Sequence, residues 1–357
     1  MRLGIMLKIH KFGFLGAIAA IAVTMPAYAQ IEASGEVNLA GYAAIYQDNF
    51  TKAVIEPFMK KYPKIKVNYV PTQLSAERLG ALRAQKDNPQ LDLALMDVAL
   101  SGVAIKEGLF AQLDPAAVPN LDDLYENARP HGKFGPALTF DHLVIIYGKN
   151  SLPVAPKSWK DLWNPANSGQ VVLNAPPNIQ GLAFTILVNH MQGGNYKQSI
   201  DPAIQKLKEL APLVQTFAPR PDSYTVVLNG TAKIGTGWNA QSQMYANRSG
   251  GKLGVVLPEE GSVFQIDTLD LVKGAKNPKA AQVFINYALS PEAQESFASA
   301  MFYAPTNKKA KVTSEVLART AAGVGERAKM IPVDWDYVAS VREQWLERWR
   351  REVISIK

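Results

Sequence analysis

Three aspartates stand where a carboxylate could bind a cation. Asp48 follows the first apolar segment after residue 30, Asp97 follows the third, and Asp267 interrupts the apolar segment 263–272. A carboxylate among apolar neighbours is costly unless a cation or hydrogen-bond donors compensate it. Because aromatic faces also attract cations, a site with carboxylates and aromatic walls suits an organic ammonium ion. These residues favour a binding site for a small amine over a catalytic centre.

Signatures of enzymes are scarce. The sequence has no GxSxG, HExxH, GxxxxGK[ST] or post-strand GxGxxG pattern, and its four histidines lie far apart. With no cysteine, a thiol nucleophile, a zinc–thiolate site and a disulfide framework are excluded. The basic residues form no run with interleaved aromatics, which disfavours nucleic-acid binding. We expect no enzyme, no cofactor and no metal, although aspartates alone leave a carboxylate metal site open.

The N-terminus predicts export. A basic segment, 1–11, precedes the largely apolar run 12–25, and a small-x-small cleavage site ends at Ala29. The run is shorter than the ~20 apolar residues that span a bilayer. We therefore expect residues 1–29 to be a signal peptide, cleaved after Ala29, and the protein to act in the periplasm. Removing its three basic residues lowers the formal net charge from +7 to +4, because it carries no acid.

Strand-like and helix-like segments alternate along the remaining chain, which predicts two α/β domains. Such alternation implies parallel sheets, and parallel sheets bind ligands beyond the carboxyl ends of their strands. We expect the last helix to dock its apolar face on a domain and to expose its Arg-rich face. The main strands are expected at 37–45, 64–70, 92–96, 143–147, 170–175, 233–238, 254–257 and 263–272, and the main helices at 51–62, 75–86, 99–107, 180–191, 203–210, 222–229, 239–247 and 334–353.

Five short motifs follow one another in the last third of the chain. They read GWN at 237–239, PEEG at 258–261, FQID at 264–267, FINYALSP at 284–291 and YAPTN at 303–307. In this order and spacing they resemble the bacterial periplasmic solute-binding proteins of the spermidine/putrescine-binding family. SWKDLW at 158–163 extends the resemblance towards the middle of the chain.

The resemblance implies an α/β, two-lobe periplasmic binding protein type II fold with a ligand cleft between the lobes. Lobe 1 would comprise residues 30–139 and 267–312, and lobe 2 residues 140–266 and 313–357. It also implies the substrate-binding component of an ABC transporter, which captures a small-molecule solute and delivers it to a membrane permease and its ATPase. We expect a monomer.

The resemblance also implies ligand-binding residues. The family has an aromatic and an acid in the first loop, a cleft tryptophan, a carboxylate that grips an amine and a cleft tyrosine, which here are Tyr46, Asp48, Trp238, Asp267 and Tyr303. To these we add Gln265, which stands where the family has a second tryptophan, and Asp97, because it ends a strand.

The second lobe departs from the polyamine-binding pattern. The positions of the family's acidic pair fall on Pro176 and Ile179, and nearby the chain offers amides and Arg220 instead (the amides are Asn174, Asn178 and Gln180). Amides and arginine donate hydrogen bonds to a carboxylate but cannot face a second ammonium. We therefore expect a small cationic or zwitterionic nitrogen compound, such as a short ω-amino acid. A polyamine, an enzyme on the same fold and a chemosensory receptor remain alternatives.

The first prediction concerns export. N-terminal sequencing of the protein from the periplasmic fraction is expected to begin at Gln30, because the cleavage site ends at Ala29. A product that keeps Met1, or that sediments with the membranes, would contradict it.

Overall fold

A ten-stranded sheet organises the part of the chain that the computed structural model describes, residues 33–356. The expected signal peptide, 1–29, lies outside these residues. The strand order is β2-β1-β3-β9-β4-β7-β5-β6, with β10 beside β9 and β8 beside β4. The strands are Gly35–Tyr42 (β1), Ile65–Thr72 (β2), Leu93–Asp97 (β3), Ala137–Gly148 (β4), Val171–Val172 (β5), Val214–Thr216 (β6), Ile234–Trp238 (β7), Leu253–Val256 (β8), Ser262–Leu271 (β9) and Met330–Ile331 (β10).

Two long strands belong to both halves of this sheet. β4 pairs antiparallel with β9 through residues 137–142 and with β7 through 143–147. β9 pairs with β3 through 267–271. On one side of this crossing β1, β2 and β3 run parallel, and on the other side so do β5, β6 and β7. β4 and β9 thus join two parallel half-sheets; the residue boundaries expected for the lobes stay a prediction.

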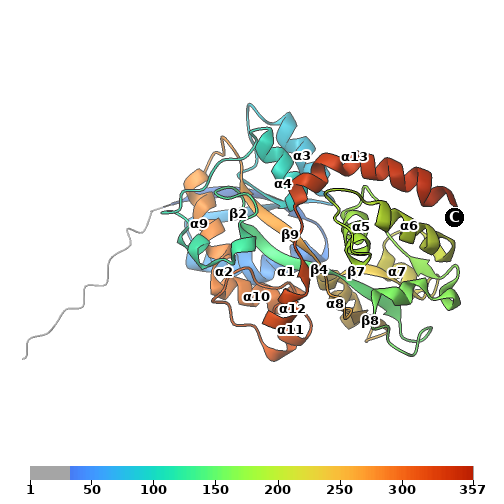
Figure 1. Ribbon diagram of the computed structural model, residues 1–357. Coiled ribbons are helices and arrows are strands. Elements are labelled where there is room, and N and C mark those ends of the chain that lie inside the picture. Colours follow the sequence, from blue (N-terminus) through green and yellow to red (C-terminus); the bar gives the residue numbers. More distant parts are fainter. Residues whose placement is uncertain (1–32, 357) are drawn as a thin grey trace, which may run out of the picture. The chain divides into compact units, whose positions relative to one another are not determined.

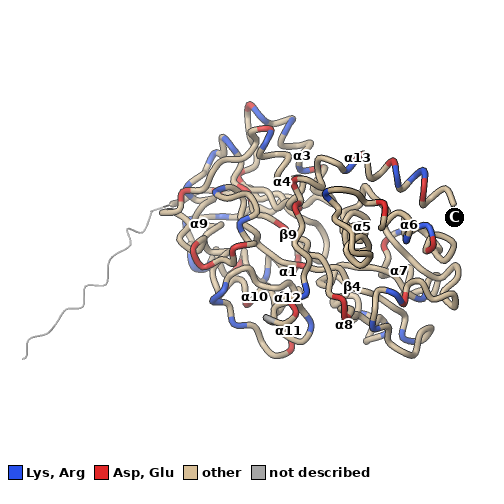
Figure 2. The backbone as a smooth tube through the Cα atoms, viewed as in Figure 1, with Lys and Arg blue, Asp and Glu red and all other residues tan. Residues whose placement is uncertain are grey.

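Helices cover both half-sheets (Figure 1). They are Ile45–Phe50 (α1), Glu56–Lys61 (α2), Ser75–Ala84 (α3), Val98–Lys106 (α4), Ile179–Met191 (α5), Asp201–Leu210 (α6), Ser223–Leu228 (α7), Asn239–Arg248 (α8), Pro278–Ala288 (α9), Pro291–Met301 (α10), Ser314–Ala318 (α11), Val324–Ala328 (α12) and Trp335–Glu352 (α13), with a π-helical turn at Thr51–Ile55. Within residues 33–356 no helix combines the length and apolarity needed to cross a membrane. Basic and acidic residues are interspersed along the backbone (Figure 2).

The first helix begins earlier than the sequence predicts. β1 ends at Tyr42, Ala44 adopts a positive φ of 57°, and the chain is helical from Ile45. The expected strand 37–45 is confirmed but ends three residues earlier, at Tyr42. The loop position expected for Tyr46 and Asp48 is wrong, because both lie in α1, where Asp48 is exposed. A left-handed alanine is uncommon, and no glycine or proline marks this turn in the sequence.

The third strand and the helix after it agree with the expectation. The run Leu93–Asp97 forms β3, and its apolar residues are fully buried, as in the centre of a sheet covered on both faces. Asp97 ends the strand and caps α4, because its Oδ1 accepts a hydrogen bond from the backbone N–H of Leu100 at 3.0 Å. The carboxyl end of β3 is thereby fixed against the start of α4.

The last helix docks on the domain as expected. Val338, Trp345 and Trp349 on one face of α13 are buried. The indole Nε1 of Trp349 donates to the Thr185 hydroxyl of α5 at 2.9 Å, so the buried N–H is satisfied.

A buried carboxyl ties β9 to α4. Asp270 is fully buried and accepts hydrogen bonds from the hydroxyls of Ser101 (3.0 Å) and Thr268 (2.6 Å). Burial is the main cause that raises the pKa of Asp270 to about 7, and these hydroxyls oppose it. Because the native state holds this proton to a higher pH than the unfolded chain does, the stability contribution is lost as pH rises from about 4 through about 7.

The second prediction follows from this linkage. Asp270→Asn is expected to flatten the decline of the free energy of unfolding between those pH values, since one such group changes it by at most about 1.4 kcal/mol per pH unit. Urea unfolding at several pH values measures it, with the exposed Asp87→Asn as the matched control. An unchanged slope in Asp270→Asn would show that Asp270 is ionised as readily in the native state as in the unfolded chain.

Candidate functional site

A buried polar cluster surrounds Asp267 at the strand crossing. In the sheet Asp267 lies opposite Asp97 on β3 and opposite Thr139 on β4. Its side chain is 2% exposed and accepts hydrogen bonds from Tyr42 Oη (2.9 Å), Gln265 Nε2 (2.6 Å) and Thr139 Oγ1 (3.5 Å). All three donors are neutral, so they solvate the carboxylate without cancelling its charge.

Burial shifts the titration of this carboxyl. Burial is the largest cause that raises the pKa of Asp267 to about 6, and the negative charge of Asp97 adds to it. Hydrogen bonds from Tyr42 and Gln265, and the positive charge of Arg78, act in the opposite direction. At neutral pH the carboxylate is mostly ionised, and its burial makes this negative charge less favourable than it would be in water.

Aromatic rings line one side of the cluster. The Tyr46 ring packs edge-on against Tyr42 and Tyr303, with centroids 5.3 and 5.9 Å apart. The Tyr46 hydroxyl is buried without a hydrogen-bond partner among residues 33–356. Burial raises the pKa of both Tyr46 and Tyr303, and the charge of Asp267 raises it further. Both tyrosines thus remain neutral donors beside a carboxylate, and the Tyr46 hydroxyl can still donate to a ligand.

A fully buried arginine belongs to the cluster and was not expected from the sequence. The Arg78 guanidinium lies 4.1 Å from the centroid of the Tyr42 ring and donates to the hydroxyls of Ser75 (2.9 Å) and Thr72. In the described chain no carboxylate lies within ion-pair distance of it, and its Nε has no hydrogen-bond partner. Arg78 occupies the same face of α3 as Ser75 and Leu82, so helical periodicity could have found it.

A second buried acid was also missed. Asp141 on β4 lies opposite Gln265 and accepts hydrogen bonds from the backbone N–H groups of His142 (2.8 Å) and Ala240 (3.2 Å). Burial is the main cause that raises the pKa of Asp141 to about 8, so it is mostly protonated at neutral pH. It therefore adds little negative charge to the site.

A cavity of about 450 Å³ opens between the two half-sheets, next to the cluster. Its polar lining comes from the end of β3, the start of α3, the loops after β5 and β6, and the last helix, namely Asp97, Ser75, Asn174, Asn178, Arg220 and Arg342. Ser75 connects the cavity to the cluster, because its hydroxyl contacts Tyr42 Oη at 3.0 Å and accepts from the Asp97 N–H at 3.0 Å. Asp267 itself does not line the cavity, but the lining residue Ser75 is connected to it by two hydrogen bonds through Tyr42 Oη.

The expected site residues fall into three groups. Tyr46, Gln265, Asp267 and Tyr303 are gathered in the buried cluster, and Asp97 lines the cavity. Trp238 ends β7 with its backbone N–H bonded to Tyr224 Oη, and no hydrogen bond or ring contact in the described chain joins its side chain to Asp267. Asp48 is exposed on α1. Their roles in binding stay predictions.

The second half-sheet contributes amides and arginine to the cavity, at positions the sequence suggested. Asn174 already donates to Gln180 (3.1 Å) and Ser223 (2.9 Å), and Asn178 Oδ1 caps α5. Arg220 is exposed at the rim.

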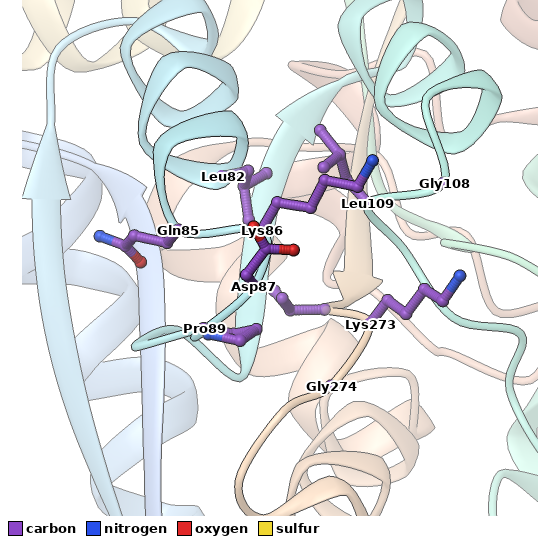
Figure 3. A pocket seen from close by; sticks show the side chains of 10 residues that line it. Leu82, Gln85, Lys86, Asp87, Pro89, Gly108, Leu109, Lys273 and Gly274 are labelled. Carbon is purple, nitrogen blue, oxygen red and sulfur yellow. The ribbon is translucent and has the colours of Figure 1, made fainter.

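Another cavity, of about 460 Å³, lies at the far end of α3. Figure 3 shows Lys86, two residues after α3, and Lys273, two residues after β9, among its lining side chains. It shares no lining residue with the cavity between the half-sheets.

Comparison with known proteins shows what this arrangement resembles. Residues 53–322 match the profile of bacterial extracellular solute-binding proteins. A spermidine/putrescine-binding periplasmic protein of Escherichia coli is 26% identical over 278 residues, which cover 75% of this chain and 78% of that protein. A gamma-aminobutyric acid-binding protein of Pseudomonas aeruginosa is 27% identical over 213 residues, which cover 57% and 58%.

Solved structures confirm the expected fold. A crystal structure described as an ABC transporter from Clostridium perfringens superposes with a TM-score of 0.74 at 25% identity, over 89% of this chain and 99% of that chain. The chain therefore has the α/β, two-lobe fold of periplasmic solute-binding proteins, with β4 and β9 as the strands shared between the lobes.

Proposed function

The chain belongs to the family of bacterial extracellular solute-binding proteins, and we propose that it captures a small solute with a protonated amine in the periplasm and delivers it to an ABC permease and its ATPase. The observation that carries this proposal is the ionised, buried Asp267, whose hydrogen-bond donors are all neutral. An ammonium group would supply the positive charge that these neutral donors do not give to Asp267. The protein acts by binding and release, with no catalytic step and no cofactor.

Electrostatics favours one ammonium group over two. On the Asp267 side, Asp97 lies opposite Asp267 in the sheet and Arg78 is the nearby base, so the negative charge near Asp267 exceeds the positive charge by about one unit. Arg220 and Arg342 line the other side of the cavity. Tyrosine faces add cation–π attraction, worth about 2 kcal/mol or more when the cation is desolvated. A monocation balances this charge, whereas a second ammonium would face Arg220 and amides across the cavity.

The relatives support the amine class. Two of them are named for binding spermidine and putrescine or gamma-aminobutyric acid, all of which carry an amine. We favour a short ω-amino acid over a polyamine because, among the described residues that line the cavity, none from the second half-sheet is an acid. The polyamine alternative keeps the support of the first relative's name. Competition calorimetry between putrescine and 4-aminobutanoate separates the two.

Binding is proposed to close the lobes. β4 and β9 run through both lobes, so small dihedral changes near 139 and 267 would move one lobe against the other. A ligand that contacts both the Asp267 cluster and the cavity residues of the second half-sheet would make more contacts in the closed state than in the open one, and so would favour closure. The closed monomer would present the surface that the permease recognises.

The third prediction tests the amine site. Asp267→Asn keeps the shape of the side chain and removes its charge, so binding of 4-aminobutanoate or putrescine is expected to weaken by about 3–5 kcal/mol, because a buried ammonium loses its partner. Below pH 6 the wild-type affinity is expected to fall about tenfold per pH unit, since Asp267 must lose its proton to bind the cation. Isothermal titration calorimetry measures both.

The matched control is Asp270→Asn, a buried acid on the same strand whose partners, Ser101 and Thr268, lie outside the cluster. It is expected to keep wild-type affinity within about threefold, less than 1 kcal/mol. Near wild-type binding by Asp267→Asn would refute the role of Asp267. Failure of the wild-type protein to bind either amine would refute the amine function.

A further inference from the structure

The C-terminal helix crosses from one half-sheet to the other. Its first turn packs on α4, where a Cβ atom built on Gly102 would lie 2.3 Å from Asp336 Oδ1. Lys106 of α4 also lies 3.8 Å from Asp336. Figure 1 shows α13 continuing from α4 along α5 and α6. The absence of a side chain at Gly102 lets α13 approach the first half-sheet this closely.

The other end of α13 is anchored on the second half-sheet. The Trp349 ring packs edge-on against Phe217, with centroids 5.8 Å apart, and its indole donates to Thr185. Arg348 pairs with Asp201 at the start of α6 at 2.5 Å. The helix is therefore held at both ends, by different half-sheets.

Between these ends, Arg342 lines the cavity. One Nη donates to the Pro177 carbonyl at 3.0 Å, while the Nε is buried and has no hydrogen-bond partner among residues 33–356. In this part of the chain no acid lies within ion-pair distance of its guanidinium. A buried donor on a charged group is costly when it is left unpaired, so the site calls for an acceptor.

The surroundings of Arg342 point to an anionic acceptor. Of the described residues that line the cavity, Arg220 and Arg342 are basic and Asp97 is the one acid. Asp97 is already engaged, since it caps α4. A carboxylate matches the Nε–H and Nη–H donors of a guanidinium in a bidentate pair, which is stronger than a neutral hydrogen bond.

We propose that Arg342 binds a carboxylate of the solute, so that the C-terminal helix forms part of the ligand site. The proposal rests on the proposed function only in taking this cavity as the place where the solute binds. Because α13 touches both half-sheets, a ligand held by Arg342 ties α13 to the closed arrangement of the lobes.

The fourth prediction tests this assignment by calorimetry with three probes of similar length. They are 4-aminobutanoate, with an amine and a carboxylate, putrescine, with amines alone, and succinate, with carboxylates alone. Arg342→Gln is expected to weaken 4-aminobutanoate at least about tenfold, or 1.4 kcal/mol, and to leave putrescine unchanged or tighter. The matched control is Arg350→Gln, an exposed residue of the same helix that pairs with Glu347.

The ratio of the two affinities separates binding from structure, because a merely destabilised α13 would weaken both probes alike. Arg342→Lys is expected to recover part of the preference for 4-aminobutanoate, since it restores the charge but not the paired donors. Equal effects on both probes, or no effect, would overturn the proposal.

Comparing the three probes in the wild-type protein separates the anion site at Arg342 from the amine function. If wild-type protein binds putrescine but neither carboxylate probe, the anion site is refuted and the amine function stands. If it binds succinate through Arg342 and neither amine, the anion site stands and the amine function is refuted.

Discussion

The burial of one negative charge at the strand crossing is the constraint on which the site depends. Asp267 sits in β9, the strand that pairs with β3 on one side and with β4 on the other, and its side chain is 2% exposed and hydrogen-bonded to Tyr42 and Gln265. Hydrogen bonds from neutral donors stabilise the carboxylate, but the loss of hydration on burial is larger, so the pKa of Asp267 is raised to about 6. The desolvation of this carboxylate favours cation binding, because a bound cation compensates the buried negative charge.

The same strands that hold Asp267 also join the two half-sheets, where we propose that the lobes hinge. β4 changes partner from β9 to β7 between His142 and Leu143. Arg342 lines the cavity of about 450 Å³, Asp267 lies behind its lining residue Ser75 through Tyr42 Oη, and α13 connects Arg342 to α4.

Much of the fold could be predicted from the sequence, because strand and helix periods alternate and each apolar strand is short and bounded. Asp267 was predictable for the same reason, as an acid inside an apolar strand. The position of Asp48 was not, since the turn at Ala44 carries neither glycine nor proline. The crossover of β4 and β9 came from the resemblance and not from composition.

The missed residues share a physical reason. Arg78 and Arg342 are charged, and a charge on a helix is expected to be solvated unless tertiary contacts bury it. Arg342 follows Val338 by four residues and precedes Trp345 by three, so it lies on the docked face of α13, and its Nε is buried. Tyr42 and Thr139 reach Asp267 from strands far away in the chain, which periodicity alone does not reveal.

The most direct test of the central claim is the proton balance of binding. At pH 6 Asp267 is about half protonated, so an ammonium that pairs with it is expected to displace about half a proton per ligand bound. Calorimetry of 4-aminobutanoate or putrescine at this pH, in buffers of different ionisation enthalpy, measures that number. Release near half a proton that disappears in Asp267→Asn is the predicted result. Binding without proton release, or with uptake, would contradict the claim that Asp267 receives the ammonium.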